Sequence, residues 1–420
     1  HGALMLKILV VFFWLLALST SQLNALDLDE KLKLVIGIYN LKPISCEIDQ
    51  RLIDDRISPI GDIVFNTTVL SGNHDTSCST CHIDEKHLTD GLSISIGVGA
   101  GEKKSDRQKS TGVIVPRNSF TLFGRAGPNF DAFFWDGKVH EIDDLIYSPI
   151  GEGYSLGFKS PLAVAAALPI LARDEFLGKI AFFNNNKSLS EINPSYYKEK
   201  FNAANKIIKE IVISEDKRYL PLQKAIKNAG VSVDDVDLAF IGNSLASFIA
   251  KKTSECKLSD WEKYLEGNPA SLSVAQKKGA IIFFGKGRCA ACHSGNSFSD
   301  FEFHSIGTPQ GEFGTHIHSQ DLGRGEVTFK LEDRFKFRTP PLIGASKTMP
   351  YGHNGVFKNL ESVISFHINP IPFFVKNGWT SEKEILTYGK LLSSRSSKLG
   401  FIEIKDRNEL LSVIDFINSL

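Results

Sequence analysis

The chain has 420 residues, and its 48 basic side chains balance 48 acidic ones, so the formal net charge at pH 7 is zero. This length predicts two or three domains, each able to bury its own core, while 42% hydrophobic residues, 23% charged residues and only six cysteines exclude disordered, collagen-like and disulfide-scaffold proteins. Because no basic block is longer than a pair such as Lys103-Lys104, the sequence gives no electrostatic reason to expect nucleic acid or anionic lipid as a partner.

Residues 1–25 are predicted to be a secretory signal peptide. Met5 is followed by Lys7, by the apolar run 8–18 and by a short polar stretch, with a cleavage position after Ala25. The apolar run is too short for a comfortable membrane span, and a retained N-terminal anchor is the alternative. We therefore expect an exported, periplasmic protein with no stable membrane span.

The mature chain is predicted to be mainly helical, with long ordered loops. One helix is expected within 26–60, and residues 91–155 are rich in glycine, proline and aromatic residues, which favours loops. Helical patterns follow over the regions 162–183 (broken near Pro169), 198–228, 236–265 and 273–286. The turn residues Gly267-Asn268-Pro269 mark a boundary between two units, residues 26–266 and 267–420.

Four of the six cysteines form two copies of one pattern, C-x-x-C-H. The copies are Cys78-Ser79-Thr80-Cys81-His82 and Cys289-Ala290-Ala291-Cys292-His293. This run is the attachment sequence of c-type haem, because two thioethers hold the porphyrin edge and the adjacent histidine is placed to bind the iron. A thioredoxin-like pair or half of a zinc site is the alternative, but neither explains a histidine after both pairs. The sequence therefore predicts two cytochrome c-like haem domains.

Cys46 and Cys256 are left over. In an oxidising compartment they could form a disulfide, although the sequence does not show their separation in space. Two free buried thiols are the alternative.

Beyond the haem motifs, the mature chain resembles the bacterial diheme cytochrome c peroxidase and MauG superfamily along nearly all of its length. The matching stretches, in the family's order, are Arg117-Asn118-Ser119, Phe134-Trp135-Asp136-Gly137-Lys138, Arg173-Asp174-Glu175-Phe176-Leu177-Gly178, Phe303-His304-Ser305-Ile306-Gly307, Asp321-Leu322-Gly323-Arg324, Phe337-Arg338-Thr339-Pro340-Pro341-Leu342 and Thr348-Met349-Pro350-Tyr351-Gly352-His353-Asn354-Gly355. The resemblance implies that the N-terminal haem reacts with peroxide, that the C-terminal haem transfers electrons, and that a calcium ion lies between the domains.

The axial positions of the N-terminal haem suggest an open iron. A peroxide-reacting iron needs histidine on one side, here His82, and a vacant position on the other. Many peroxidases of this superfamily carry a blocking histidine sixteen residues later, where this chain has Val98. The resemblance therefore implies an open haem in the resting ferric protein. The alternative is that His87 or another loop histidine takes the position.

The C-terminal haem is expected to have two histidine ligands. Family members place the sixth ligand fourteen residues after the histidine of the Pro-Tyr-x-His motif, and here that residue is His367. The peroxidases have methionine there and MauG has tyrosine. Because Met5 and Met349 are the only methionines, a methionine ligand at that position is impossible. An iron held by His293 and His367 should have a lower potential than a methionine-ligated one. A surface histidine is the alternative interpretation of His367.

Two further residues are candidates for the chemistry. By resemblance to the family's Glu-Met-Gly stretch, Glu175 is the expected acid-base group of the distal pocket. Glu152 lies nearer the spacing of the shorter peroxidases, and either glutamate could instead be solvated. Trp135 resembles the tryptophan that relays electrons between the two haems, with a buried core tryptophan as the alternative.

Asn118, Thr348 and Pro350 correspond to the family's calcium ligands. They offer one side-chain oxygen and two backbone carbonyls, which suits a hard cation completed by water. His316 and His318 form a His-x-His sequence that could bind a metal but is more often a polar loop.

The sequence thus predicts a periplasmic diheme oxidoreductase that reacts with hydrogen peroxide. One outcome is peroxide removal with a small cytochrome c or cupredoxin as electron donor. The other is MauG-like oxidation of side chains in a partner protein, which Val98 and His367 favour because they remove the need for reductive activation. A non-catalytic diheme electron carrier is the alternative, and it predicts that both irons are six-coordinate.

Overall fold

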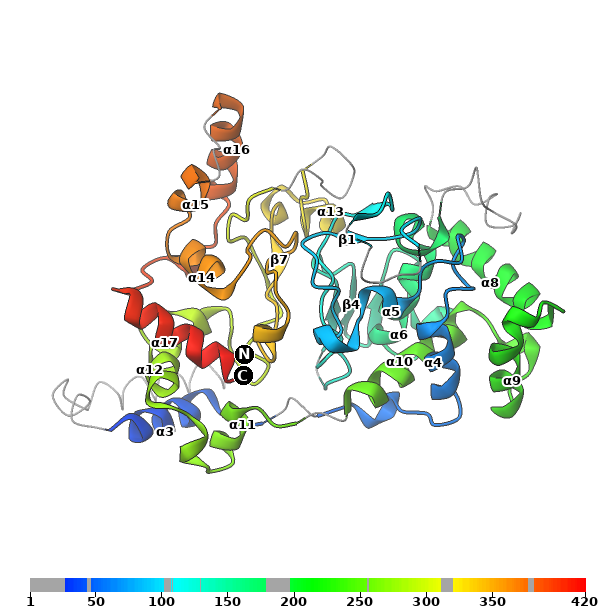
Figure 1. Cartoon of the computed structure of the whole chain (residues 1–420), viewed down its shortest axis with the longest axis horizontal. Helices are drawn as coiled ribbons and strands as arrows, with labels where there is room; N and C mark the ends of the chain where they lie inside the picture. Colours follow the sequence, from blue (N-terminus) through cyan, green and yellow to red (C-terminus); the bar gives the residue numbers. More distant parts are fainter. Residues whose placement is uncertain are drawn as a thin grey trace.

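The structure is a computed structural model that describes residues 27–43, 47–101, 107, 109–128, 130–178, 197–254, 257–310, 320–376 and 381–420. The predicted signal peptide, Cys46, Cys256, His316 and His318 lie outside these described residues. Two helical lobes lie next to one another with short strands between them (Figure 1). Within the described ranges, no helix combines the length and hydropathy that a membrane crossing requires.

The N-terminal lobe is built around helix α10 (Leu238–Ser254). This helix packs against α4 (Ser58–Asn66) and α6 (Pro161–Ala167), while α8 (Tyr197–Ile213) and α9 (Leu220–Asn228) complete the lobe. Close packing of α4 on α10 requires Gly61, because a Cβ there would lie 2.0 Å from the carbonyl oxygen of Ser244. The one-turn helix α5 (Cys78–Cys81) follows α4 and carries the first cysteine pair.

The region predicted as loops, residues 91–155, also contains five short strands. Strand β1 (Ser95–Ile96) pairs with β2 (Ile114–Val115), and β3 (Ala132–Phe133), β4 (Val139–Ile142) and β5 (Leu145–Tyr147) form an antiparallel sheet. The strands have only two to four residues each, too few for an alternating pattern to be visible in the sequence.

The C-terminal lobe is built on the packing of α12 (Val274–Phe284) against α17 (Arg407–Asn418), and a Cβ on Gly279 would lie 1.8 Å from the Ser412 carbonyl oxygen. Helices α3 (Leu28–Tyr39) and α11 (Asp260–Leu265) precede residue 267, yet they pack in this lobe. Leu32 of α3 and Trp261 of α11 are buried in its core. Packing therefore groups two segments of the predicted N-terminal unit with the C-terminal core.

The rest of the C-terminal lobe faces the N-terminal lobe or extends away from it. Strand β6 (Phe303–His304) pairs with β7 (Phe337–Arg338), and α13 (Gly325–Thr328) lies between them in sequence. Helices α14 (Leu360–Ile368), α15 (Ile371–Lys376) and α16 (Glu382–Ser393) extend from α17 and share a small aromatic core (Figure 1). The predicted mainly α fold with long loops is confirmed.

Candidate functional site

The N-terminal lobe contains a cavity whose wall includes the first C-x-x-C-H motif. Cys78 and Cys81 are not in a disulfide, and burial raises the pKa of each thiol to about 12. The Nδ1 atom of His82 lies 2.8 Å from the carbonyl oxygen of Leu88. Donation of the Nδ1 proton to this carbonyl leaves Nε2 free for a metal, the usual arrangement of a ligating histidine. The residues fit a covalently attached haem.

Glu175 lies in the wall of the same cavity, on the π-helical turn η6 (Arg173–Leu177). Burial raises the pKa of its carboxyl group, and its charge in turn acts on both cysteine thiols of the motif. Glu152, the other candidate, is exposed and is not part of this wall. Of the two glutamates, only Glu175 is therefore positioned to meet a molecule bound in the cavity.

Two glycines allow the backbone to hold the turn that carries Glu175. The backbone N–H of Val98 donates to the Asp174 carbonyl at 3.0 Å, and that of Gly72 donates to the Phe176 carbonyl at 2.9 Å. A Cβ on Gly97 would lie 1.7 Å from the Asp174 oxygen. Only glycine permits this approach, so the position of Glu175 depends on a segment about 80 residues away in the chain.

Val98, His87 and His140 lie at different places relative to this cavity. Val98 is buried outside the wall, which is formed at this point by Ser95 and Gly97. His87 also lies outside it, stacked on Phe123 with 4.2 Å between ring centroids. His140 does line the cavity, although the sequence analysis did not single it out.

His140 is constrained by its own sheet. Its Nδ1 lies 2.9 Å from the Gly137 carbonyl oxygen, and its ring stacks on Tyr147, its partner across strands β4 and β5. His140 does not contribute to the lowered pKa of His82, which burial and the charge of Arg125 produce. Strand β4 has only four residues and its burial does not alternate, so the sequence carries no clear signal for His140.

A second cavity in the C-terminal lobe brings together the second motif and His367. Cys289, Cys292, His293 and His367 all line it. The Nδ1 atoms of His293 and His367 lie 3.0 and 2.7 Å from the carbonyl oxygens of Phe298 and Val363, so both Nε2 atoms are free. Burial, together with the nearby His367, lowers the pKa of His293 to about 4. The two neutral imidazoles fit a haem iron with two histidine ligands.

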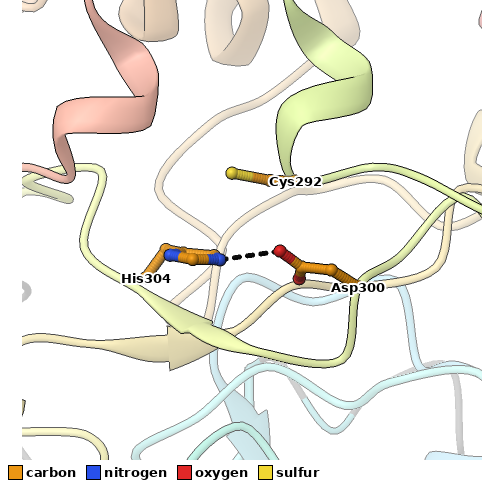
Figure 2. A group of neighbouring side chains, drawn as sticks. All are labelled: Cys292, Asp300 and His304. Atoms are coloured by element: carbon orange, nitrogen blue, oxygen red, sulfur yellow. Dashed lines mark hydrogen bonds and ion pairs between the residues drawn. The ribbon is translucent and has the colours of Figure 1, made fainter. Parts of the chain in front are cut away.

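Cys292, Asp300 and His304 form a cluster of potential metal ligands beside this cavity (Figure 2). His304 Nε2 lies 2.8 Å from Asp300 Oδ2, and Lys398 Nζ lies 3.0 Å from the same oxygen. The bond to Asp300 raises the pKa of His304 to about 9. Because the C-x-x-C-H motif assigns the sulfur of Cys292 to a haem thioether, the cluster is better described as an ion-paired histidine at the cavity edge.

Trp135 lines both cavities. Its indole N–H donates to the backbone carbonyl of Asn118 at 3.0 Å, and Asn118 also lines both cavities. The Asn118 amide nitrogen lies 3.3 Å from the carbonyl oxygen of Pro350, while Thr348 lies in the wall of the C-terminal cavity. The predicted electron-transfer and calcium residues therefore gather between the two lobes.

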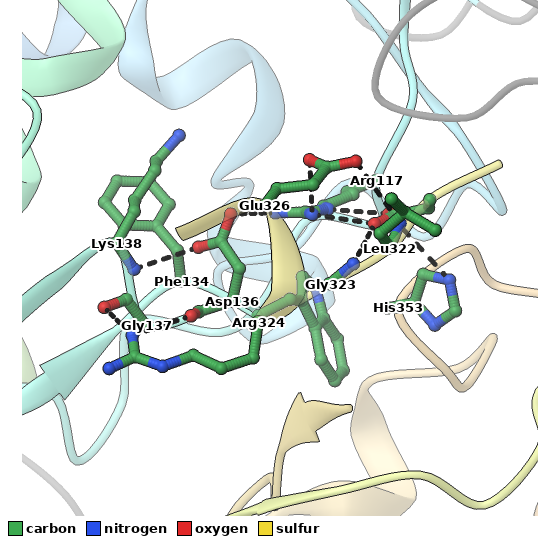
Figure 3. Close-up of polar contacts among 12 residues, drawn as sticks. Arg117, Phe134, Asp136, Gly137, Lys138, Leu322, Gly323, Arg324, Glu326 and His353 are labelled. Carbon is green, nitrogen blue, oxygen red and sulfur yellow. Dashed lines mark hydrogen bonds and ion pairs between the residues drawn. The ribbon is translucent and has the colours of Figure 1, made fainter. Parts of the chain in front are cut away.

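A buried ion-pair network that includes Asp136, the residue after Trp135, joins the lobes (Figure 3). The Arg117 guanidinium bonds Asp136 of the N-terminal lobe and Asp321 of the C-terminal lobe. Burial alone would raise the pKa of Asp321, but the contacts with Arg117 lower it to about 2. His353 stacks on Phe337, with 3.6 Å between centroids, and lies 3.9 Å from Asp321. These residues belong to stretches that carry the family resemblance, but their network was not predicted because its members are distant in the chain.

Two cavities, each containing a cysteine pair and an adjacent histidine with a free Nε2, define a protein with two c-type haem sites.

Comparisons with known proteins support a di-haem protein. Residues 56–270 match the family model described as di-haem cytochrome c peroxidase. The chain is 26% identical over 311 residues to the methylamine utilization protein MauG of Methylorubrum extorquens, covering 74% of this chain and 67% of that protein. It is also 26% identical over 328 residues to cytochrome c551 peroxidase of Pseudomonas aeruginosa, covering 77% and 76%.

A solved structure shares the fold. The diheme peroxidase BthA from Burkholderia thailandensis superposes with a TM-score of 0.60 over 88% of this chain and 86% of that chain, at 15% identity. The chain therefore belongs to the di-haem cytochrome c peroxidase family. It is a diheme oxidoreductase with two c-type haems, which confirms the predicted family, enzyme class and haem cofactors.

Proposed function

We propose that this protein reduces hydrogen peroxide at an open haem attached to Cys78 and Cys81 and ligated by His82. Electrons come through a second haem ligated by His293 and His367. The observation that carries the proposal is the difference between the cavities: His367, with a free Nε2, accompanies His293 in one, whereas in the other Glu175 accompanies His82 and His140 is stacked on Tyr147 in its own sheet.

In this proposal the side chains of the N-terminal cavity bind haem and move protons. When bound, the haem supplies an iron that reacts with peroxide. The Leu88 carbonyl holds the proximal imidazole of His82 in its ligating orientation. The Glu175 carboxylate takes a proton from one peroxide oxygen and returns it to the other as the O–O bond breaks. The raised pKa of Glu175 brings its proton affinity closer to that required for such a transfer.

Trp135 links the two sites. Its indole is adjacent to both cavities and is held by the hydrogen bond to Asn118, so it can pass single electrons between them. His293 and His367 would hold the C-terminal haem, and two histidine ligands would give it a low potential and favour its ferric form. A low-potential ferric haem favours the MauG-like outcome, in which the two haems store oxidising equivalents. It does not favour a mechanism that requires reductive activation. A small cytochrome c or cupredoxin donor is the second outcome within the same proposal.

Calcium and location are further parts of the proposal. Asn118, Thr348 and Pro350 are proposed to hold calcium between the lobes, supported by the 3.3 Å separation of the Asn118 amide from the Pro350 carbonyl oxygen. Rotation of the Asn118 amide would turn its oxygen toward the Pro350 carbonyl oxygen.

The periplasm is the proposed location, because residues 1–25 have the pattern of a signal peptide and haem attachment of this type accompanies export.

Low-temperature EPR and optical spectra of the as-isolated ferric protein, before and after stoichiometric hydrogen peroxide, test the proposal. We expect one high-spin and one low-spin haem, with peroxide consuming the high-spin signal without prior reduction. Two low-spin haems that react with peroxide only after half-reduction would contradict the open haem and indicate an activation-dependent peroxidase. No response in any redox state would support a plain electron carrier.

Variants assign the signals to residues. His367→Ala should convert the low-spin haem to high spin, because it removes one of two strong-field ligands. His140→Ala is the matched control: this histidine also lines a cavity, but it should leave both resting signals unchanged.

A further inference from the structure

We propose that Arg125 and Arg338 are the binding site for haem propionate carboxylates between the two cavities. This inference rests on the haem positions proposed above, and it adds a role for two residues that neither the haem motifs nor the axial ligands explain.

Both arginines are buried charges, and in the described part of the chain neither has a carboxylate at ion-pair distance. Arg125 is 4% exposed and Arg338 is 2% exposed. Arg125 Nε donates to the Thr121 carbonyl at 2.9 Å, and Arg338 Nε donates to the Phe134 carbonyl at 3.2 Å. Among the described residues, no aspartate or glutamate forms an ion pair with either guanidinium. Each guanidinium has five N–H donors, so several remain for a ligand.

The two charges also lie close enough to repel each other. Burial and the charge of Arg338 both lower the pKa of Arg125. Burial lowers the pKa of Arg338 to about 10, although the charges of Asp131 and Asp136, which form no ion pair with it, act in the opposite direction. A buried arginine normally acquires a paired anion, because its desolvation is otherwise not compensated. Arg117 illustrates this rule nearby, since it is largely buried but bonds both Asp136 and Asp321.

Both arginines line the space where haem is proposed to bind. Arg125 lines both cavities and Arg338 lines the C-terminal one. The Phe130 ring lies near both groups, with its centroid 4.6 Å from the Arg125 guanidinium carbon and 5.2 Å from that of Arg338.

The anion that enters these cavities with haem is the propionate carboxylate. Its two oxygens match the planar fork of a guanidinium. Arg125 would hold a propionate of the haem on His82, and Arg338 one of the haem on His293. The backbone N–H of Arg338 donates to the Trp135 carbonyl at 2.8 Å, so the site is built next to the proposed electron relay.

Spectroelectrochemical titration and resonance Raman spectra of the haem-loaded protein test this site. A positive charge beside a haem favours the ferrous form, so Arg338→Gln should reduce the equilibrium constant for reduction of the His293 haem by about tenfold. Arg125→Gln should act in the same direction on the His82 haem. Each change should also shift the propionate bending band of the affected haem.

Two further variants keep the test decisive. Arg324→Gln removes an equally positive side chain that lines neither cavity and bonds the backbone carbonyls of Asp136 and Gly137, so both potentials should stay close to wild type. If a glutamine variant loses haem, Arg125→Lys or Arg338→Lys should retain the charge and the potential but still shift the Raman band. Unchanged potentials and bands in variants with two attached haems would overturn the inference.

These readouts do not require turnover. A protein that carries two haems but does not react with peroxide would count against the proposed function. The potentials and Raman bands would still decide whether the two arginines bind propionates.

Discussion

Replacing Asp321 by asparagine should weaken the connection between the lobes. Asp321 is 3% exposed, and its carboxylate oxygens accept 2.8 Å hydrogen bonds from Nε and Nη2 of Arg117. Asparagine has nearly the same shape and can still accept the bond from Gly323 N–H, but it removes the negative charge. Arg117 would then depend on Asp136 for its closest ion pair.

The size of the effect follows from the pKa of Asp321. Burial opposes ionisation, yet Arg117 lowers the pKa from 3.8 to about 2. A difference of that size corresponds to about 2.5 kcal/mol. Because the pKa is lower in the folded protein, this stabilisation is fully present above about pH 4 and is lost as the pH falls to about 2. Breaking a buried pair costs about 3–5 kcal/mol, so we expect a loss of about 2–4 kcal/mol at pH 7 with Asp136 still in place.

Urea unfolding of the haem-loaded protein, followed by circular dichroism and by the Soret band, measures this loss. Asp216→Asn is the matched control, because Asp216 forms the same two-point contact with Arg218 on the surface, where solvent screens it. We expect little change in that control. The reasoning is wrong if Asp321→Asn is as stable as the control, or if its difference from wild type does not shrink between pH 4 and pH 2.

The remaining predictions concern the proposed N-terminal haem site and the electron relay. Glu175→Gln should slow the reaction with peroxide by about 10²- to 10⁴-fold in stopped-flow measurements, whereas Glu152→Gln, on an exposed residue, should react at the wild-type rate. Gly97→Ala should also slow that reaction and lower the melting temperature, because its Cβ would lie 1.7 Å from a carbonyl oxygen of the turn that carries Glu175. Gly37→Ala, in helix α3 with nothing within 4 Å, should instead stabilise the protein by about 0.5–1 kcal/mol. Trp135→Phe should slow electron exchange between the haems while both resting EPR signals persist, and an unchanged exchange rate would rule out the relay.

Sequence reasoning was strongest where the chemistry is local. The two C-x-x-C-H motifs predicted both haem attachment sequences, because two thioethers and an adjacent ligand require residues within about one turn of backbone. Helical regions between residues 162 and 286 were also recognised, since amphipathic helices carry a periodic signal, whereas α14 to α17 were not predicted. Spacing within a recognised family identified His367, and the structure places it in the same cavity as His293. Its role as an axial ligand remains a prediction.

Tertiary structure decided the contacts between distant residues. Spacing could not separate Glu175 from Glu152, because the position of Glu175 depends on backbone contacts with residues 72 and 98. Nor could it show that α3 packs beside α12 in the C-terminal core.

The same limit applies between the lobes. The Arg117 network connects residues about 200 positions apart in the chain. Arg125 and Arg338, which lack an ion-pair partner among the described residues, are separated by a similar distance in sequence and line the same cavity. By itself the sequence determined which groups can bond haem covalently, because that chemistry lies within five consecutive residues. The packing of the two lobes against each other determined which charges are buried, which are paired and which line a cavity. Burial and distance are properties of the folded chain, so the sequence could not show them.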